Sequence, residues 1–214
     1  MAKQPTIQQR RFRTMLIVGQ RACGKSTYIR NLITTLQNSG NGNRKIVVVD
    51  KEYNAMYNEL PTMTTANFGY WCNDENRFDT VRYVEKQGKK SLANLTKYFR
   101  FSTKNNIIGC AIVEDFVRYF PVRGKAPDSL TNYYADSKQI RTDVISVCHS
   151  IKLVPPEVWG WTDDLVLFKT GESQKIVEQR LESVEARDEI LEAYQKVNAK
   201  SYPMYKPIYV KLRN

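Results

Sequence analysis

The chain has 214 residues, of which 42% are hydrophobic and 26% are charged, a balance typical of a globular protein with a full core. No apolar run is long enough to span a bilayer, and residues 1–10 hold no signal-peptide core, so we expect a cytoplasmic protein without a membrane segment. Lysine and arginine outnumber aspartate and glutamate by 33 to 22. This net charge of +11 argues against a small metabolite as the only target and favours a polyanionic partner. The four cysteines share no metal-binding spacing, so we expect reduced thiols and no zinc site.

Five short apolar runs, rich in β-branched residues, predict strands that are covered on both faces of a sheet. They span residues 14–18, 45–49, 107–113, 143–148 and 164–168. Helical patterns lie between them, at 25–37 and at 89–101. Strands that alternate with helices indicate an α/β fold with a mainly parallel central sheet and flanking helices. We expect this fold to occupy residues 1–214 as a single domain.

The end of the chain differs in character from the rest. One long amphipathic helix is predicted over 172–199 from apolar residues at helical spacing. These apolar residues are Val177, Leu181, Val184, Leu191 and Tyr194. The sequence Tyr-Pro-Met-Tyr-Lys-Pro ends this helix, and alternating apolar residues from 208 to 212 predict an added edge strand. Residues 51–88 are the least regular part of the chain and the expected place of an insertion.

The most specific motif is Gly19-x-x-x-x-Gly24-Lys25-Ser26, which follows the first predicted strand and begins a predicted helix. Backbone N–H groups must wrap an anionic phosphate closely in such a loop, and glycine allows the turn that this needs. Lys25 supplies a charge for the β- and γ-phosphates, Ser26 offers a hydroxyl to Mg²⁺, and the helix directs its positive end at the same phosphates. The motif predicts a site for ATP and Mg²⁺, lined by Gly19, Gln20, Arg21, Ala22, Cys23, Gly24, Lys25, Ser26 and Thr27.

A phosphate loop of this kind needs an acidic partner that holds Mg²⁺ and orients a water molecule. The best candidate is the pair Glu114-Asp115, which ends the apolar run at 107–113. Position assigns Glu114 to the metal and Asp115 to the water. The usual order is Asp then Glu, however, so the two carboxylates can also exchange these roles. The rival pair, Asp163-Asp164, precedes a predicted strand instead of following one.

Two further candidates flank the strand predicted at 143–148. His149, the only histidine of the chain, follows this strand and is placed to contact the γ-phosphate, unless it merely completes its hydrogen bonds at a strand end. Arg141 precedes the strand. In ring-shaped ATPases a cation in such a position stabilises the transition state at the neighbouring subunit's γ-phosphate. Lys138 is the alternative for this role, and a solvated surface arginine is the plainer interpretation of Arg141.

Basic and aromatic residues are interleaved in the segment that follows the acidic pair. Arg118, Arg123 and Lys125 lie there, where loops at the carboxyl ends of strands face the ligand side of such a sheet. We expect them to contact a nucleic-acid backbone, with nearby aromatic rings available for stacking. The predicted helix at 89–101 offers a second basic surface through Lys89, Lys90, Lys97 and Arg100, although most charged helix faces are simply solvated.

These segments together resemble the FtsK–HerA branch of the P-loop ATPases, above all the small viral and phage ATPases that package DNA. The resemblance covers most of the chain and rests on residues 19–26, 112–116, 139–149, 154–156 and 165–171. It implies a RecA-like sheet in which the strand ending at His149 lies between the strands of the phosphate loop and of the acidic pair. The Glu-Asp order and the lack of a strong arginine consensus depart from the family pattern, which leaves the catalytic base and the arginine finger open.

The resemblance further implies an ATP-hydrolysing motor that moves double-stranded DNA and assembles as a homo-oligomeric ring, either a pentamer or a hexamer. A capsid or portal protein is an expected partner, and the virion or the host cytoplasm is the expected location. Three alternatives stay open. The first is a phage morphogenesis ATPase of the zonular-occludens-toxin type, which normally carries a membrane segment. The second is a small-molecule kinase, which the high positive charge disfavours. The third is a nucleotide-gated switch or a DNA-binding structural protein, which would bind ATP with little turnover.

Overall fold

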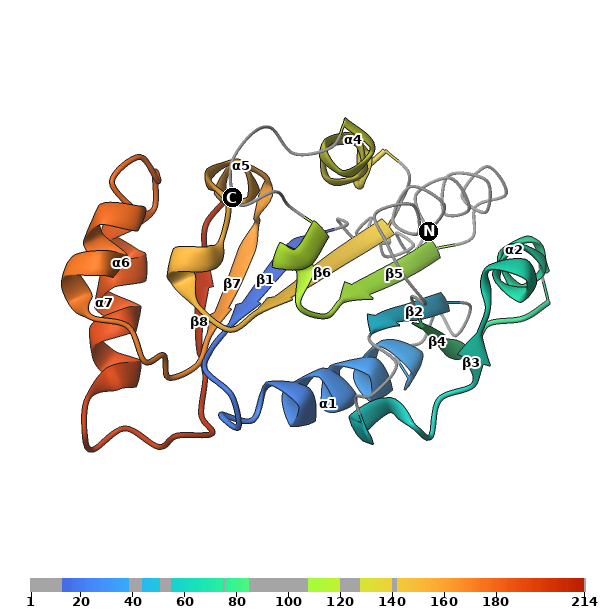
Figure 1. Ribbon diagram of the computed structural model, residues 1–214, viewed down its shortest axis with the longest axis horizontal. Coiled ribbons are helices and arrows are strands. Elements are labelled where there is room, and N and C mark those ends of the chain that lie inside the picture. The colour runs from blue at the N-terminus through green and yellow to red at the C-terminus, as the bar shows by residue number, and fades with distance from the viewer. Residues whose placement is uncertain are drawn as a thin grey trace, which may run out of the picture.

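One mainly parallel sheet forms the centre of the molecule (Figure 1). The structure, a computed structural model, describes residues 13–38, 44–50, 55–74, 76–84, 108–119, 128–139 and 142–213. Within these residues, eight strands lie side by side in the order β3-β4-β2-β5-β6-β1-β7-β8. Their bounds are β1 Thr14–Val18, β2 Arg44–Asp50, β3 Thr62–Met63, β4 Thr80–Val84, β5 Ile108–Val113, β6 Thr142–Cys148, β7 Asp164–Leu167 and β8 Ile208–Lys211. Each pairing is parallel except that of β7 with β8, which is antiparallel.

Helices cover both faces of this sheet because its inner strands are apolar on both sides. Along β1, Leu16 and Val18 pack into one core, whereas Ile17 packs into the other. The core around Ile17 is closed by α1 (Lys25–Asn38). The opposite core is closed by α2 (Thr65–Asn73), α4 (Asp128–Asp136), α5 (Pro156–Trp161), α6 (Gln174–Arg180) and α7 (Arg187–Asn198). The fold is therefore a three-layer α/β arrangement, as predicted from the alternation of strands and helices.

The five strands predicted from apolar runs are present as β1, β2, β5, β6 and β7, with ends that differ from the predicted ones by at most one residue. The structure places β6 between β1 and β5, as the resemblance implied. Because these three strands are parallel, their carboxyl ends meet at one edge of the sheet, where the connecting loops form a crevice suited to a ligand.

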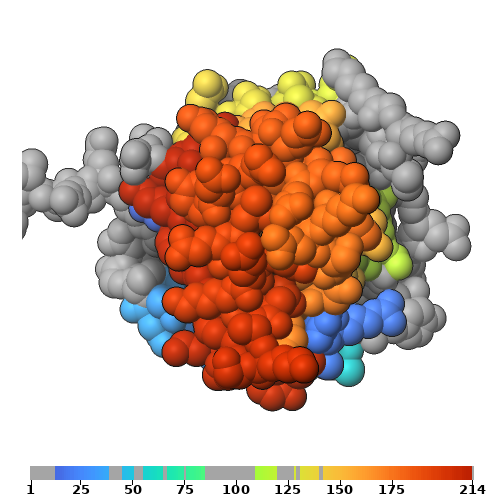
Figure 2. Space-filling model, turned by 90° about the vertical axis from the view of Figure 1, so that its left-hand side faces the viewer, coloured from blue at the N-terminus to red at the C-terminus, as the bar shows by residue number. Residues whose placement is uncertain are grey.

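The prediction of one long helix over 172–199 is wrong. Two helices, α6 and α7, occupy this stretch and are joined by a turn around Leu181 and Val184, where the N–H of Val184 donates to the carbonyl of Leu181. A single helix of that length would span about 42 Å, whereas the seven-residue strands span only about 23 Å. The turn brings the apolar faces of both helices back onto the sheet. Figure 2 shows the end of the molecule that these orange and red elements cover.

Residues 51–88, where we expected an insertion, extend the sheet at its β2 edge. Their described part contains β3, α2 and β4, and β4 pairs with β2 in parallel. The helix predicted at 89–101, with its basic surface, lies outside the described residues. Three short 3₁₀ helices also occur in the described part of the chain, and they are η1 Ala55–Tyr57, η2 Phe116–Tyr119 and η3 Ile151–Leu153. None of the helices that the structure describes is long and apolar enough to cross a membrane.

Candidate nucleotide site

The predicted phosphate loop connects β1 to α1 and is tied to the strands on both sides of β1. The N–H of Gly19 donates to the carbonyl of Cys148 at the end of β6 (3.2 Å), and the N–H of Gln20 donates to the carbonyl of Lys169 beyond β7 (2.8 Å). A Cβ atom at Gly19 would lie only 2.5 Å from Cβ of Phe168, so glycine is required there by close packing. Gly24 requires glycine for a different reason, because its φ of +94° lies in a region that side chains disfavour.

Lys25 lies at the centre of the loop with only 6% of its surface exposed. Its Nζ donates hydrogen bonds to the carbonyls of Gly19 (2.5 Å) and Gln20 (2.7 Å). Burial lowers the pKa of this ammonium from its usual value. The loop thus holds a positive charge where its motif predicts contact with phosphates.

The predicted acidic pair directly follows β5 at the same edge of the sheet. Burial raises the pKa of Glu114 to about 6, and a hydrogen bond of 2.5 Å from the Tyr57 hydroxyl to its Oε1 acts in the opposite direction. Asp115 adopts a left-handed backbone conformation with φ of 51°, which Asp tolerates better than most residues. The two adjacent carboxylates have different partners, because Glu114 contacts Tyr57 whereas Asp115 contacts His149 and Arg118.

His149 connects the phosphate loop to Asp115. Its Nδ1 lies 3.2 Å from Nζ of Lys25, and its Nε2 lies 3.5 Å from Oδ1 of Asp115. A lysine ammonium can only donate, so Nδ1 accepts and the neutral ring carries its proton on Nε2, toward the carboxylate. Asp115 in turn forms an ion pair with Arg118, from Oδ2 to Nε at 3.1 Å. The four side chains form one continuous line of polar contacts.

A cavity of about 660 Å³ opens between the loop and these polar side chains. Nucleotide-sized ligands commonly occupy pockets of this size. Its lining contains loop residues 21–27 together with Asp50, Met56, Glu114, Asp115, His149 and Tyr205. The structure therefore brings together the loop, the acidic pair and the histidine that the sequence singled out separately.

Several residues of this site were not found from the sequence. Asp50 ends β2 and is buried in an ion pair with Arg82 of β4, with Oδ2 of Asp50 3.0 Å from a guanidinium nitrogen. An acidic residue after an apolar run was a signal for it, as it was for Glu114. Tyr57 and Tyr205 carried no comparable signal, because their contacts depend on how distant segments of the chain fold together.

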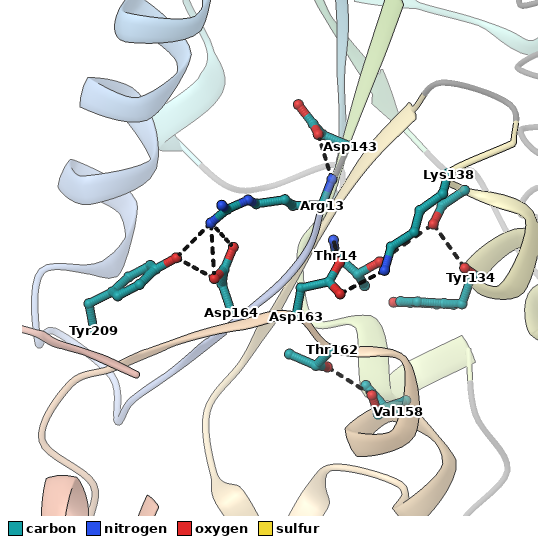
Figure 3. Close-up of polar contacts among 11 residues, drawn as sticks. Arg13, Thr14, Tyr134, Lys138, Asp143, Val158, Thr162, Asp163, Asp164 and Tyr209 are labelled. Atoms are coloured by element: carbon teal, nitrogen blue, oxygen red, sulfur yellow. Dashed lines mark hydrogen bonds and ion pairs between the residues drawn. The ribbon is translucent and has the colours of Figure 1, made fainter. Parts of the chain in front are cut away.

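The rival acidic pair lies at the opposite, amino edge of the sheet (Figure 3). Asp163 accepts hydrogen bonds from Lys138 (2.7 Å) and from the N–H of Thr14 (3.0 Å), and Asp164 is paired with Arg13 (3.0 Å). Both carboxylates thus join the start of β7 to neighbouring segments. This placement leaves Glu114-Asp115 as the acidic pair beside the phosphate loop, and it places Lys138 in an ion pair within its own chain.

The remaining predicted site residues divide into two groups. Arg118 lies in η2 beside the cavity. It forms an ion pair with Asp115, and 57% of its side chain is exposed. Arg141, Arg123 and Lys125 lie outside the described residues, and so do Lys89, Lys90, Lys97 and Arg100.

Comparison with known proteins adds information about the fold. No protein-family model and no curated protein sequence matches the chain. The genome packaging NTPase B204 from Sulfolobus turreted icosahedral virus 2, in complex with AMPPCP, matches with a TM-score of 0.75 at 14% identity, over 94% of this chain and 93% of that one. The DNA-packaging ATPase B204 from Sulfolobus turreted icosahedral virus matches with a TM-score of 0.73 at 14% identity, over 94% of this chain and 92% of that one.

A third similar structure comes from a larger protein. ATPases 2 and 3 of EssC from Geobacillus thermodenitrificans match with a TM-score of 0.58 at 12% identity, over 93% of this chain and 37% of that one. These similarities span at least 93% of this chain and concern its fold. The chain therefore has the P-loop NTPase fold, and it shares this fold over nearly its whole length with viral genome-packaging NTPases.

Proposed function

We propose that the protein hydrolyses ATP with Mg²⁺ and uses the energy to move double-stranded DNA during viral genome packaging. The observation that carries this proposal is the line of contacts from Lys25 through His149 to Asp115, within a cavity that the phosphate loop lines. A structural ion-pair cluster would not need a loop shaped for phosphates. A catalytic site needs both the loop and the polar groups at its end.

The loop binds and orients the triphosphate. Its backbone N–H groups and the N-terminus of α1 face the phosphates. The Lys25 ammonium, which donates to loop carbonyls in this structure, can donate to β- and γ-phosphate oxygens instead. His149 is close enough to Lys25 to contact the same γ-phosphate. Binding and charge neutralisation supply most of the catalysis in phosphoryl transfer, because the protein forms no covalent bond itself.

The oxygen atoms that line the cavity suit Mg²⁺, which prefers carboxylate, hydroxyl and phosphate ligands. Ser26 and Glu114 would hold the ion, and when bound it would neutralise charge on the phosphates. Asp115 orients the attacking water, and its contact with His149 fixes the carboxylate. Asp50 adds a negative charge near Glu114 and contributes to the raised pKa of that residue.

Three observations support DNA as the partner. The net charge of +11 suits a polyanion, and Arg118 is exposed beside the cavity, in the segment that leads to Arg123 and Lys125. Two similar structures are those of a genome packaging NTPase and a DNA-packaging ATPase. We propose a homo-oligomeric ring in which Arg141 completes the neighbouring site, acting with a capsid or portal protein in the virion or the host cytoplasm.

Hydrolysis by variants of the two acidic pairs tests the catalytic assignment. Glu114→Gln and Asp115→Asn should each reduce Mg²⁺-dependent ATP turnover by about 100-fold or more, because each removes a charge that acts on the phosphates, the metal or the water. Asp163→Asn is the matched control, and it should keep wild-type turnover per folded molecule. Wild-type rates in both Glu114→Gln and Asp115→Asn would show that this pair is not catalytic.

A further inference from the structure

An exposed tyrosine lies against the phosphate loop. Tyr205 has 71% of its surface exposed, yet it lines the nucleotide cavity. A Cβ atom built on Gly24 would lie 3.4 Å from its Cδ1 atom, so Tyr205 packs against the loop at Gly24. In Figure 1 the red segment between α7 and β8 passes beside the blue loop between β1 and α1.

The backbone of the turn that carries this ring is constrained. The segment around Tyr205 contains Pro203 and Pro207, whose rings fix the local φ angles. The N–H of Lys206 donates to the carbonyl of Pro203 (3.2 Å), which closes a turn around the tyrosine. The Tyr202 hydroxyl donates to the carbonyl of Pro207 at 3.4 Å. An exposed aromatic ring on a turn that is fixed in this way is suited to stacking, since little freedom is lost on contact.

The sheet order gives the cavity two different ends. Asp50 ends β2, and Glu114 and His149 directly follow β5 and β6. These three strands all lie on one side of β1. Tyr205 leads into β8, which lies on the other side of β1, beyond β7. The phosphate loop lies between these ends. A triphosphate with its γ-phosphate at the acidic end therefore directs its nucleoside toward Tyr205.

We propose that Tyr205 forms a stacking surface for the base of the bound nucleoside triphosphate. This inference rests on the proposed function and adds the contact that holds the nucleoside. Stacking on an aromatic ring is available to every base because each has a π-face. Tyr205 thus contributes to the affinity for nucleotides without selecting strongly between adenine and guanine.

Binding measurements separate the base from the phosphates. Isothermal titration with ATP, GTP and inorganic tripolyphosphate is carried out on the wild type, Tyr205→Ala and Tyr205→Phe. Loss of a stacked base weakens binding by about 5- to 100-fold. Tyr205→Ala should show this loss for ATP and GTP alike and keep its affinity for tripolyphosphate. Tyr205→Phe keeps the ring and should bind all three compounds as the wild type does.

The control is Tyr70→Ala, which removes a tyrosine that is 81% exposed on α2, away from the cavity, and should leave all three affinities unchanged. Wild-type ATP affinity in Tyr205→Ala would overturn the inference, as would an equal loss of ATP and tripolyphosphate, which would mean that the ring only shapes the loop. An equal loss in Tyr205→Phe would assign the effect to the hydroxyl and also overturn stacking. The proposed function fails separately if Lys25→Ala binds tripolyphosphate as tightly as the wild type.

Discussion

Tyr57 donates a hydrogen bond of 2.5 Å to Oε1 of Glu114. The two residues come from different elements, since Tyr57 ends η1 and Glu114 follows β5. Tyr57 is almost fully buried, so its hydroxyl gives the carboxylate a fixed partner inside the protein. This contact holds Glu114 in one orientation near Lys25 and Asp50, and burial still raises the pKa of Glu114 to about 6.

This raised pKa makes the stability of the protein depend on pH. Folding favours the protonated form of Glu114, whose usual pKa is 4.5, so stability falls as the pH rises from about 4.5 to 6. Glu114→Gln stays neutral and still accepts the bond from Tyr57. Without nucleotide or Mg²⁺, it should be more stable than the wild type at pH 8 by up to about 2 kcal/mol, and equally stable at pH 4.

Urea unfolding at the two pH values measures this difference. Glu192→Gln on the exposed face of α7 is the matched control and should change stability by less than about 0.5 kcal/mol at either pH. A Glu114→Gln variant that is less stable than the wild type at pH 8 would contradict the buried, charge-disfavouring environment of this carboxylate.

Glycine substitutions test the packing of the phosphate loop. Gly19→Ala places a Cβ atom 2.5 Å from Cβ of Phe168 and 2.8 Å from Sγ of Cys23, both buried, so the loop must shift. ATP binding should weaken by at least about tenfold, because misplaced N–H groups lose their contacts with the phosphates. Gly160→Ala in α5 meets no atom within 4 Å and should raise stability by up to about 1 kcal/mol. Titration calorimetry and thermal unfolding give the two quantities, and unchanged ATP affinity in Gly19→Ala would contradict the loop geometry.

Mixing two inactive variants tests the proposed ring. Arg141→Ala should bind ATP but not hydrolyse it, if Arg141 acts on the neighbouring subunit. Lys25→Ala cannot use its own site but can still provide Arg141 to a neighbour. Rings that contain both variants should regain part of the wild-type turnover, because some boundaries combine an intact phosphate loop with an intact Arg141. Size-exclusion chromatography shows whether the two variants have assembled together. Co-assembled mixtures that stay inactive would argue against an arginine finger that acts between subunits.

Much of the core architecture could be predicted from the sequence, because it follows from local patterns. The apolar run before Gly19 and the run before Glu114 each read as a buried strand, and each ends in the group that the chemistry needs. Parallel pairing then brings these groups to one edge without further information. Asp50 also comes at the end of an apolar run, so the same reasoning would have placed a third carboxylate at the nucleotide site.

The rest of the site depends on contacts between distant segments. Tyr57 reaches Glu114, and Tyr205 reaches Gly24, only after the sheet has formed. The break between α6 and α7 was missed because Leu181 and Val184 continue the helical spacing, whereas the length of the sheet decides where the chain must turn. Such tertiary constraints override local propensity and leave little trace in the sequence.

The rate of ATP hydrolysis with and without duplex DNA, measured over a series of salt concentrations, tests the proposed motor most directly. We predict that DNA raises the wild-type rate and that Lys25→Ala shows no turnover in either condition. DNA affinity should fall with salt along a log–log slope of about −0.9 for each phosphate contacted. Combined replacement of Arg118, Arg123 and Lys125 by Ala should reduce both this slope and the stimulation. A wild-type rate that duplex DNA leaves unchanged at every salt concentration would contradict a DNA-translocating ATPase.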